Sequence, residues 1–204
     1  MTDDHVPTAR SVDSNLFITV SGPPGCGATT LCDGLSAALD CGYVSGGDIF
    51  RELAEDRDMS LSQLIAKTDE TDEIDRALDR RLRTIAEKWG SSNKAFILES
   101  RLAGWLAGNR ADFRIWLDAP EEVRVDRTRD RDEMEAEMRV REVSEAGRYR
   151  SYYGIDVTDQ SFYDLSVNTA RWSPEATLEM VLTAIEEYDP EVDEGAFQTK
   201  DIDL

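Results

Sequence analysis

The clearest candidate for chemistry is a glycine-rich stretch near the N-terminus. Positions 22–30 read GPPGCGATT, directly after an apolar run at 16–20 and before a helical pattern. Glycines at such a strand-to-helix turn let backbone N–H groups point at an anion, and the helix N-terminus adds partial positive charge. The stretch therefore predicts a phosphate-binding loop. Its residues are Gly22, Pro23, Pro24, Gly25, Cys26, Gly27, Ala28, Thr29 and Thr30.

The loop departs from the phosphate-loop pattern G-x-x-x-x-G-K-[ST] at one position, because Ala28 stands where the pattern has lysine. That lysine normally bridges the β- and γ-phosphates of a nucleotide, and alanine cannot. Thr29 stands where a hydroxyl ligand of Mg²⁺ belongs. The loop predicts phosphate binding, and catalysis requires positive charge from elsewhere. The alternative is a turn that uses its glycines for geometry alone.

Arginines recur where two further strands are expected to end. Ser45, Asp48 and Arg51 follow the second expected strand, and Arg101 follows the third. Ligands of open α/β sheets bind beyond the carboxyl ends of the strands. Arginine grips phosphate in a bidentate manner, and a carboxylate accepts hydrogen bonds from a base amino group or a sugar hydroxyl. These residues predict a second anion site beside the loop.

A third group lies further along the chain. Arg141, Glu145 and Arg148 have i, i+4, i+7 spacing, so one helix face carries all three. Taken alone, they could equally form a solvated face with ion pairs, and the same holds for Arg127, Arg129 and Arg131. A phosphate loop together with a second arginine-lined pocket is the arrangement that moves a phosphoryl group between two anionic ligands.

Alternating strands and helices must position these residues. Apolar runs predict strands at 16–20, 42–45, 95–98, 113–117 and 162–167. Helical patterns cover 29–39, 73–89 and 174–188, and a further helix begins near Asp48 as its N-cap. In the helix at 73–89, arginines and aspartates are expected on the outer face. The alternation predicts an α/β fold with a parallel sheet covered on both faces. The sequence at 126–153 does not alternate between strand and helix patterns. We therefore expect a mobile helical segment there.

Length and charge limit the classes of function. The 204 residues fit one domain at 15–188, with a flexible leader at 1–14 and an acidic tail at 189–204. With 43 acidic and 23 basic residues, the net charge is -20. That charge argues against binding to nucleic acid or to an anionic membrane. Scarce lysine in an acidic chain favours a protein adapted to concentrated salt, although an ordinary acidic protein is the alternative.

The cysteines and termini give no sign of a metal site or of export. Cys26, Cys32 and Cys41 lack CxxC spacing and the chain has one histidine, so we expect no zinc site and reduced thiols. The start of the sequence lacks the apolar segment of a signal peptide, and no apolar run is long enough to span a membrane. We expect a cytoplasmic protein that acts as a monomer on small molecules.

Taken together, these motifs resemble the archaeal-type cytidylate kinases of the nucleoside-monophosphate kinase group. The similar stretches include ITVSGPPGCGATT, YVSGGDIFRELAEDRDMSL, IDRALDRRL, LESRLAGWLAG, IWLDAPEEVRVDR, REVSEAGRYRSYYGID and FYDLSVNTARW. The resemblance implies a P-loop nucleoside-monophosphate kinase fold: a five-stranded parallel sheet with an NMP-binding region at about 46–90 and a LID at about 126–153. It also implies transfer of the γ-phosphoryl group of ATP to CMP or dCMP, with Mg²⁺.

The resemblance further implies roles for individual residues. Residues 22–30 would hold the ATP phosphates, with Thr29 at the metal. Ser45, Asp48, Arg51 and Arg101 would line the acceptor site. Arg141, Glu145 and Arg148 would reach the base, ribose and phosphate of the acceptor, and Arg127 and Arg131 would be LID arginines over the transferring phosphate. The chain departs from the family at Ala28, where lysine is usual, and at Ser100, where glycine is usual.

Three functions stay open at this stage. The first is an active (d)CMP kinase in which Arg127, Arg131, Arg139 or Arg141 replaces the missing lysine charge. The second is a nucleotide-binding protein of the same fold with weak or no turnover. The third is a kinase for another small acceptor, such as AMP or shikimate, because a phosphate loop does not specify the acceptor. The presence of all the acceptor-site arginines favours an enzyme over a pure ATP sensor.

Overall fold

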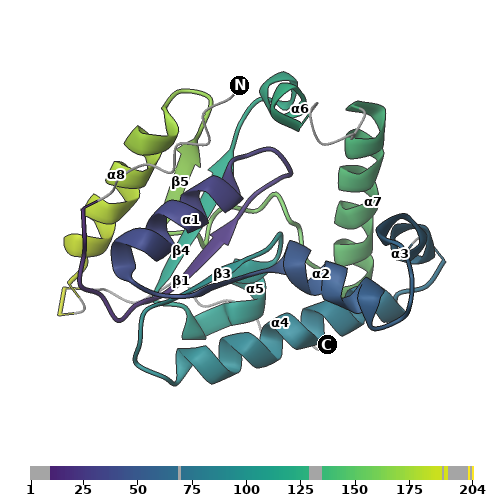
Figure 1. The fold of residues 1–204 in the computed structure, drawn as a ribbon, viewed down its shortest axis with the longest axis horizontal. Coiled ribbons are helices and arrows are strands. Elements are labelled where there is room, and N and C mark those ends of the chain that lie inside the picture. The colour runs from purple at the N-terminus through teal and green to yellow at the C-terminus, as the bar shows by residue number, and fades with distance from the viewer. Residues whose placement is uncertain (1–9, 69, 129–134, 190, 193–201, 203) are drawn as a thin grey trace.

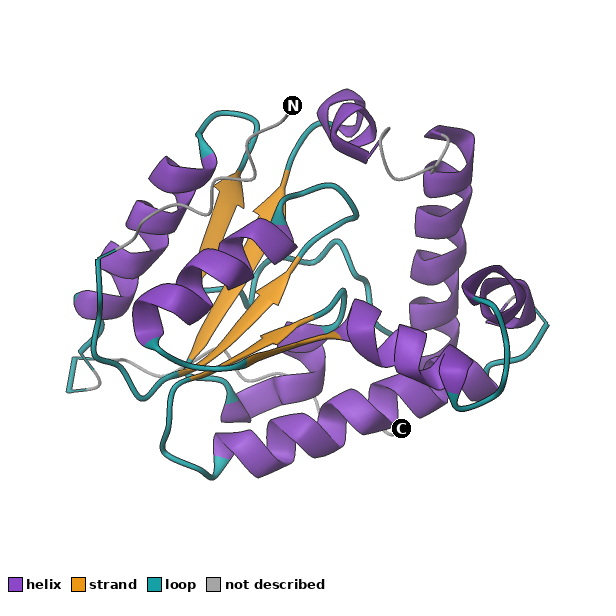
Figure 2. Cartoon of the chain, in the orientation of Figure 1, coloured by secondary structure: helices purple, strands orange, loops and turns teal. Residues whose placement is uncertain are grey.

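Five parallel strands form a single sheet in the order β2-β3-β1-β4-β5. The computed structural model describes residues 10–68, 70–128, 135–189, 191–192, 202 and 204. Figures 1 and 2 show the strands fanning through the centre of the molecule between two layers of helices. The expected α/β fold with a parallel sheet is confirmed. The strands are β1 (Phe17–Ser21), β2 (Tyr43–Ser45), β3 (Phe96–Glu99), β4 (Phe113–Asp118) and β5 (Leu165–Asn168).

Helices cover both faces of the sheet. Helices α1 (Ala28–Leu39) and α8 (Pro174–Glu186) lie on one face, and α4 (Glu73–Gly90) and α5 (Ala103–Ala107) lie on the other. Helix α7 (Glu135–Tyr153) stands at one side of the molecule, on the right in Figure 1. The remaining elements are α2 (Gly46–Glu55), α3 (Leu61–Thr68), the 3₁₀ turn η1 (Gly108–Arg110) and α6 (Glu121–Thr128).

Strand β1 shows why the sheet must be covered twice. All five of its residues are buried. Phe17 packs into the cluster under α4 and α5, while Ile18 and Val20 pack into the cluster under α1 and α8. Successive strand side chains point to opposite faces, so a continuous apolar run requires a layer of helices on each side.

Two expected boundaries were wrong. The N-cap of α2 is Ser45, not Asp48, because the Ser45 hydroxyl accepts the Gly47 N–H at 3.1 Å. The last strand begins at Leu165, not at Phe162. Just before it, the Asp164 carboxylate accepts the backbone N–H of Arg114 at 2.6 Å, which occupies the donor that an earlier ladder bond would need.

Helix α4 corrects a further expectation, because two of its aspartates are buried rather than solvated. Asp75 is 8% exposed and Asp79 is 3% exposed. They lie one helical turn apart and face α7. Asp75 forms an ion pair with Arg148, and Asp79 accepts a hydrogen bond from the Tyr153 hydroxyl. These two carboxylates therefore belong to the buried face of α4 and not to its solvent-exposed face.

The segment expected to form a mobile excursion is helical at both of its ends. Helix α6 closes at Thr128, and α7 runs from Glu135 to Tyr153. Tyr149 lies in the core cluster under α4 and α5, so the last turns of α7 are packed against the body of the protein. Arg129 and Arg131 lie outside the described residues.

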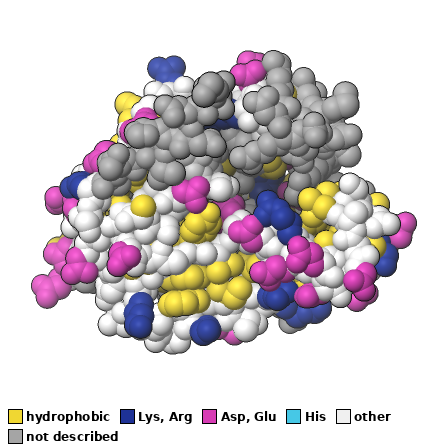
Figure 3. Space-filling model, viewed as in Figure 1, with side chains coloured by type: hydrophobic (Ala, Val, Ile, Leu, Met, Phe, Trp, Pro, Cys, Tyr) yellow, Lys and Arg dark blue, Asp and Glu magenta, His cyan; other side chains and the backbone are white. Residues whose placement is uncertain are grey.

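The described ends of the chain contact the fold. Val12 is buried and donates its N–H to Ala38 at 2.9 Å, and Arg10 forms ion pairs with Glu179 and Glu186. Near the other end, Ile202 and Leu204 pack against the core cluster under α4 and α5. Acidic side chains are spread over the face in Figure 3. Among the described helices, none is long and apolar enough to cross a membrane.

Candidate active site

The glycine-rich loop joins the carboxyl end of β1 to α1. Gly25 and Gly27 have φ values of 77° and 94°, a left-handed conformation that favours glycine. A Cβ on Gly22 would lie 2.3 Å from the carbonyl oxygen of Leu117, so this position has no room for a side chain. In the described structure no side chain caps α1 at Gly27, which leaves the first N–H groups of the helix to a ligand.

The side chains of the loop divide into buried and exposed groups. Cys26 is buried, and burial raises the pKa of its thiol to about 11, so it is a packed, unreactive group. Ala28 is half-buried at the first position of α1 and packs against the cluster under α1 and α8. Thr29 and Thr30 are exposed in the first turn, where their hydroxyls can reach a ligand.

Arg124 of α6 supports the loop from behind. This buried guanidinium donates to the carbonyl oxygens of Pro24 at 3.1 Å and Ala119 at 3.0 Å, and it forms an ion pair with Glu142 of α7. A Cβ on Gly25 would lie 2.6 Å from the Arg124 carbonyl oxygen, so the loop and α6 are in direct backbone contact. Sequence reasoning did not find Arg124.

Arg127, one turn later on α6, also reaches the loop. It donates to the Gly25 carbonyl oxygen at 3.2 Å and to the Thr169 hydroxyl at 2.9 Å. The Thr169 hydroxyl donates in turn to the Cys26 carbonyl oxygen at 2.8 Å. The structure thus places this expected site residue against the loop, in contact with the segment that follows β5.

The expected acceptor residues gather at the ends of β2 and β3. Asp48 and Arg51 form an exposed ion pair one turn into α2. A Cβ on Gly46 would meet the Ser100 side chain at 2.8 Å, so the start of α2 packs on the turn after β3. Burial raises the pKa of Glu99 in this turn, and a hydrogen bond with Ser45 opposes the shift.

Arg101, which follows β3, contacts helix α7. Arg101 Nε lies 3.7 Å from a carboxylate oxygen of Glu145, and both side chains are mostly buried. Further down α7, Arg148 Nε lies 2.6 Å from a carboxylate oxygen of Asp75, and the Tyr153 hydroxyl donates to Asp79 at 2.8 Å. Burial raises the pKa of Asp79 to about 7, although the Tyr153 hydrogen bond acts in the opposite direction. The side chain of Arg141 lies outside the described part of α7.

Comparison with known proteins identifies the group to which this arrangement belongs. A family profile described as an AAA domain matches residues 18–150. Cytidylate kinase of Haloquadratum walsbyi is 50% identical over 192 residues, which cover 92% of this chain and 98% of the relative. The chain belongs to the family of the archaeal cytidylate kinases. Cytidylate kinase of Pyrococcus horikoshii is 41% identical over 92% of this chain and 97% of that protein.

Solved structures show the same fold at much lower identity. Shikimate kinase from Acinetobacter baumannii has a TM-score of 0.54 at 18% identity, covering 83% of this chain and 92% of that one. A gluconokinase from Sinorhizobium meliloti has a TM-score of 0.54 at 14% identity, covering 87% and 93%. These likenesses confirm a P-loop kinase fold. Relatives from halophilic archaea also accord with the acidic, lysine-poor composition.

The residues that sequence reasoning missed share one property: their role depends on a contact with a distant element. Asp75, Asp79 and Tyr153 join α4 to α7, and Arg124 joins α6 to the loop. One signal was available for the aspartates. They repeat at i, i+4 directly beside the apolar stripe of α4, so they border the buried face.

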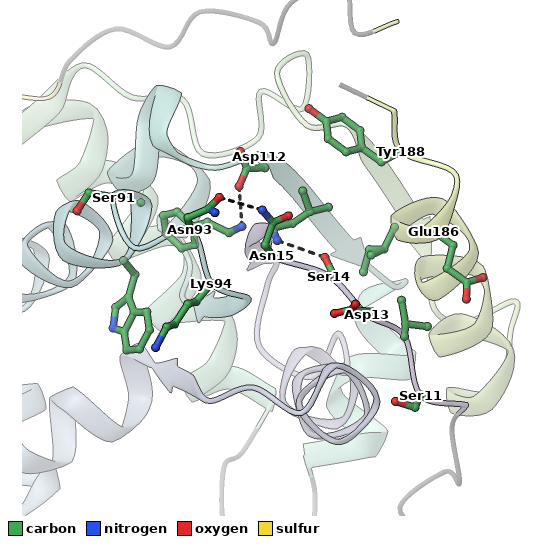
Figure 4. Close-up of a pocket in the computed structure, with 16 residues that line it drawn as sticks. Ser11, Asp13, Ser14, Asn15, Ser91, Asn93, Lys94, Asp112, Glu186 and Tyr188 are labelled. Carbon is green, nitrogen blue, oxygen red and sulfur yellow. Dashed lines mark hydrogen bonds between the residues drawn. The ribbon is translucent and has the colours of Figure 1, made fainter. Parts of the chain in front are cut away.

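A cavity of about 600 Å³ lies at the opposite end of the sheet, where the strands begin (Figure 4). Asn15 donates to Asn93 at 2.9 Å across it, and Asp112 accepts the Phe17 N–H at 2.7 Å. These bonds fasten the amino ends of β1, β3 and β4. The cavity is therefore separate from the phosphate loop. Among the described residues, no group of three or more His, Cys, Asp or Glu side chains could hold a metal ion by itself.

Proposed function

We propose that the protein transfers the γ-phosphoryl group of ATP to CMP or dCMP. The observation that carries the proposal is the position of two anion sites on neighbouring strands. The glycine loop follows β1, Arg101 follows β3, and these strands pair directly in parallel. Their carboxyl ends lie at one edge of the sheet, so a donor phosphate and an acceptor phosphate would meet there.

The donor side would be held mainly by backbone. The uncapped N-terminus of α1 and the left-handed glycines suit the phosphates of ATP, and Arg124 and Arg127 keep the loop in shape. Mg²⁺ fits here because it prefers substrate phosphates and few protein oxygens, and the exposed Thr29 hydroxyl offers one. When bound, the ion would supply positive charge to the phosphate oxygens.

The acceptor side would be held by side chains. Arg51 and Arg101 would bind the phosphate of the acceptor, Ser45 and Asp48 would line its approach, and Glu145 and Arg148 would face the rest of the nucleotide. Arg127, Arg131 and Arg141 stay our candidates for the charge over the transferring group. Because Ala28 supplies no charge, the reaction depends on such arginines to stabilise the transition state.

The first test is acceptor profiling. The protein in molar KCl with ATP and Mg²⁺ is offered CMP, dCMP, UMP, AMP and shikimate, and ADP formation is followed. We expect CMP and dCMP to be the best acceptors. The relatives described above are named cytidylate kinases, which favours turnover over a nucleotide-binding protein without it. If no acceptor raised ADP formation above the background rate, the proposal would be wrong.

A second test assigns the acceptor arginine. Arg51→Ala should raise the KM for CMP about 10- to 100-fold and leave ATP binding unchanged, because a charged hydrogen bond to phosphate is lost. Arg81→Ala is the matched control, since Arg81 pairs with Glu52 and Asp56 on the outer surface. Equal losses for both nucleotides in Arg51→Ala would contradict the assignment.

A further inference from the structure

Helix α7 carries carboxylates at two neighbouring turns, and they meet arginines from different parts of the site. Glu142 pairs with Arg124 of α6, which supports the phosphate loop, and Glu145 contacts Arg101, which follows β3. Positions 142 and 145 share one helix face, because residues three apart are neighbours on a helix. Figure 1 shows α6 and the first turns of α7 at the same end of the molecule. The earlier carboxylate therefore faces the donor side, and the later one faces the acceptor side.

The contact between Glu142 and Arg124 is the closer of the two. Both carboxylate oxygens of Glu142 accept hydrogen bonds from the Arg124 guanidinium, one of them at 3.3 Å, and the two side chains are 21% and 8% exposed. Arg101 Nε, by contrast, lies 3.7 Å from the nearest Glu145 oxygen, which is beyond hydrogen-bond distance. A bidentate pair fixes the plane of the guanidinium as well as its distance, so Glu142 sets the orientation of Arg124.

Arg124 needs this carboxylate because it is a buried charge. Its further hydrogen bonds go to neutral carbonyl oxygens, those of Ala119 and of Pro24 in the phosphate loop. Removing one member of a buried ion pair leaves the other charge uncompensated. A guanidinium that turned toward water to regain solvation would release the Pro24 carbonyl oxygen. The shape of the loop therefore depends on a carboxylate of α7.

The later turns of α7 are held by contacts of their own. Tyr149 is buried in the core cluster under α4 and α5, and the Tyr153 hydroxyl donates to Asp79 at 2.8 Å. Because these contacts do not involve α6, they remain when the Glu142 carboxylate is lost. The half of α7 that borders the acceptor side should then keep its place.

We propose that Glu142 is a positioning residue of the donor site, which sets the affinity of the phosphate loop for ATP through Arg124. It acts by holding the guanidinium against the Pro24 carbonyl oxygen. This inference rests on the proposed function, since it takes ATP as the ligand of the loop. The first turns of α7 thus serve the donor, although the same helix carries residues that face the acceptor.

The test compares Glu142→Gln with the parent and with Arg150→Gln in molar KCl. Calorimetry measures the binding of a non-hydrolysable ATP analogue with Mg²⁺ and, separately, the binding of CMP. In Glu142→Gln we expect the affinity for the analogue to fall about 3- to 30-fold and that for CMP to stay within about twofold. Arg150→Gln breaks an α7 ion pair with Asp156 whose side chains are 70% and 49% exposed, so both affinities should stay within about twofold.

Two further variants show whether Glu142 acts through Arg124. If it does, Glu142→Gln should have little additional effect on analogue binding in an Arg124→Gln background, because the two changes remove the same contact. Glu142→Asp keeps the charge with a shorter reach, so its affinity for the analogue should lie between those of the parent and Glu142→Gln. If Glu142→Gln gives no cooperative thermal melt, Glu142→Asp enters the comparison of analogue and CMP binding in its place.

Three outcomes in the variants would overturn the inference: an unchanged affinity for the analogue in Glu142→Gln, equal losses for the analogue and CMP, or fully additive effects of Glu142→Gln and Arg124→Gln. A parent protein that does not bind the analogue also overturns it. A parent that binds the analogue and phosphorylates no acceptor contradicts the proposed function alone, and the measured affinities still test Glu142.

Discussion

Arg127 and Thr169 hold each other through two hydrogen bonds of 2.9 Å, one to the threonine hydroxyl and one to its backbone oxygen. The same guanidinium donates to Gly25, and the same hydroxyl donates to Cys26. One arginine and one threonine therefore join three segments: α6, the phosphate loop and the chain after β5. The shape of the loop depends on this contact as well as on its own glycines.

We predict that Thr169→Val weakens the donor site. Valine keeps the shape of this buried residue but leaves the Cys26 carbonyl oxygen and one Arg127 donor without their partner, at a cost of about 1–3 kcal/mol. The KM for ATP should rise roughly 5- to 100-fold, with little change in CMP binding. Thr177→Val is the control, because Thr177 is similarly buried in α8 and its hydroxyl has no hydrogen-bond partner among the described residues. Indistinguishable ATP kinetics in the two variants would contradict the prediction.

The sheet could be predicted from sequence because its strands are buried on both faces. Four of the five expected strands correspond to β1 to β4. Each of them begins and ends within one residue of the observed strand. The last strand was extended too far because Tyr163 continues the alternation of Leu165 and Val167, and the apolar Phe162 precedes it. In the structure Phe162 packs on Trp105 and Tyr163 packs on Trp116. A period-two pattern cannot separate a strand from aromatic residues that lead into it.

The site was predictable where its residues follow strand ends, and not where they depend on packing between helices. Ser45, Arg51 and Arg101 could be placed because the carboxyl ends of parallel strands meet at one edge. The contact between Tyr153 and Asp79 joins residues 74 positions apart, and Arg124 reaches Pro24 across 100 positions. A local sequence pattern does not encode a contact between residues so far apart in the chain.

The buried carboxylate of Asp79 predicts a pH dependence of stability. Because burial raises its folded-state pKa from 3.8 to about 7, the protonated form is favoured in the folded protein. Its stabilising contribution is present below about pH 4 and is lost as the pH rises toward 7, by up to about 4 kcal/mol. An amide at this position cannot ionise, so Asp79→Asn should gain stability relative to the parent between pH 5 and 8.

Denaturant unfolding in molar KCl at pH 5, 6, 7 and 8 measures this difference. The amide oxygen of the variant can still accept the Tyr153 hydroxyl, so the comparison isolates the charge. A difference in unfolding free energy that does not change across this range would show that Asp79 is ionised throughout.

The charge of the chain predicts that salt stabilises the fold. Its net charge is -20, and the Debye length falls from ~30 Å at 0.01 M to ~3 Å at 1 M salt. We expect the melting temperature and the activity to rise together from dilute buffer to molar KCl. Sucrose at matched osmolality is the control, because it is excluded from the protein surface without screening charge. An equal rise in sucrose, or none in KCl, would contradict screening as the cause.

The last prediction concerns Ala28 at the first position of α1. Its half-buried methyl group leaves the N–H groups of the loop in place, so ATP should bind. What the loop lacks is a cation that follows the charge as it shifts toward the leaving oxygen, and one such preorganised group is typically worth about 10²–10³ in rate. Ala28→Lys should therefore raise kcat while changing ATP affinity less. Ala28→Met adds a chain of similar length without charge and should not raise kcat. If Ala28→Lys leaves kcat unchanged or lowers it as Ala28→Met does, the arginines of α6 and α7 already supply the charge, and alanine at this position is not a deficit.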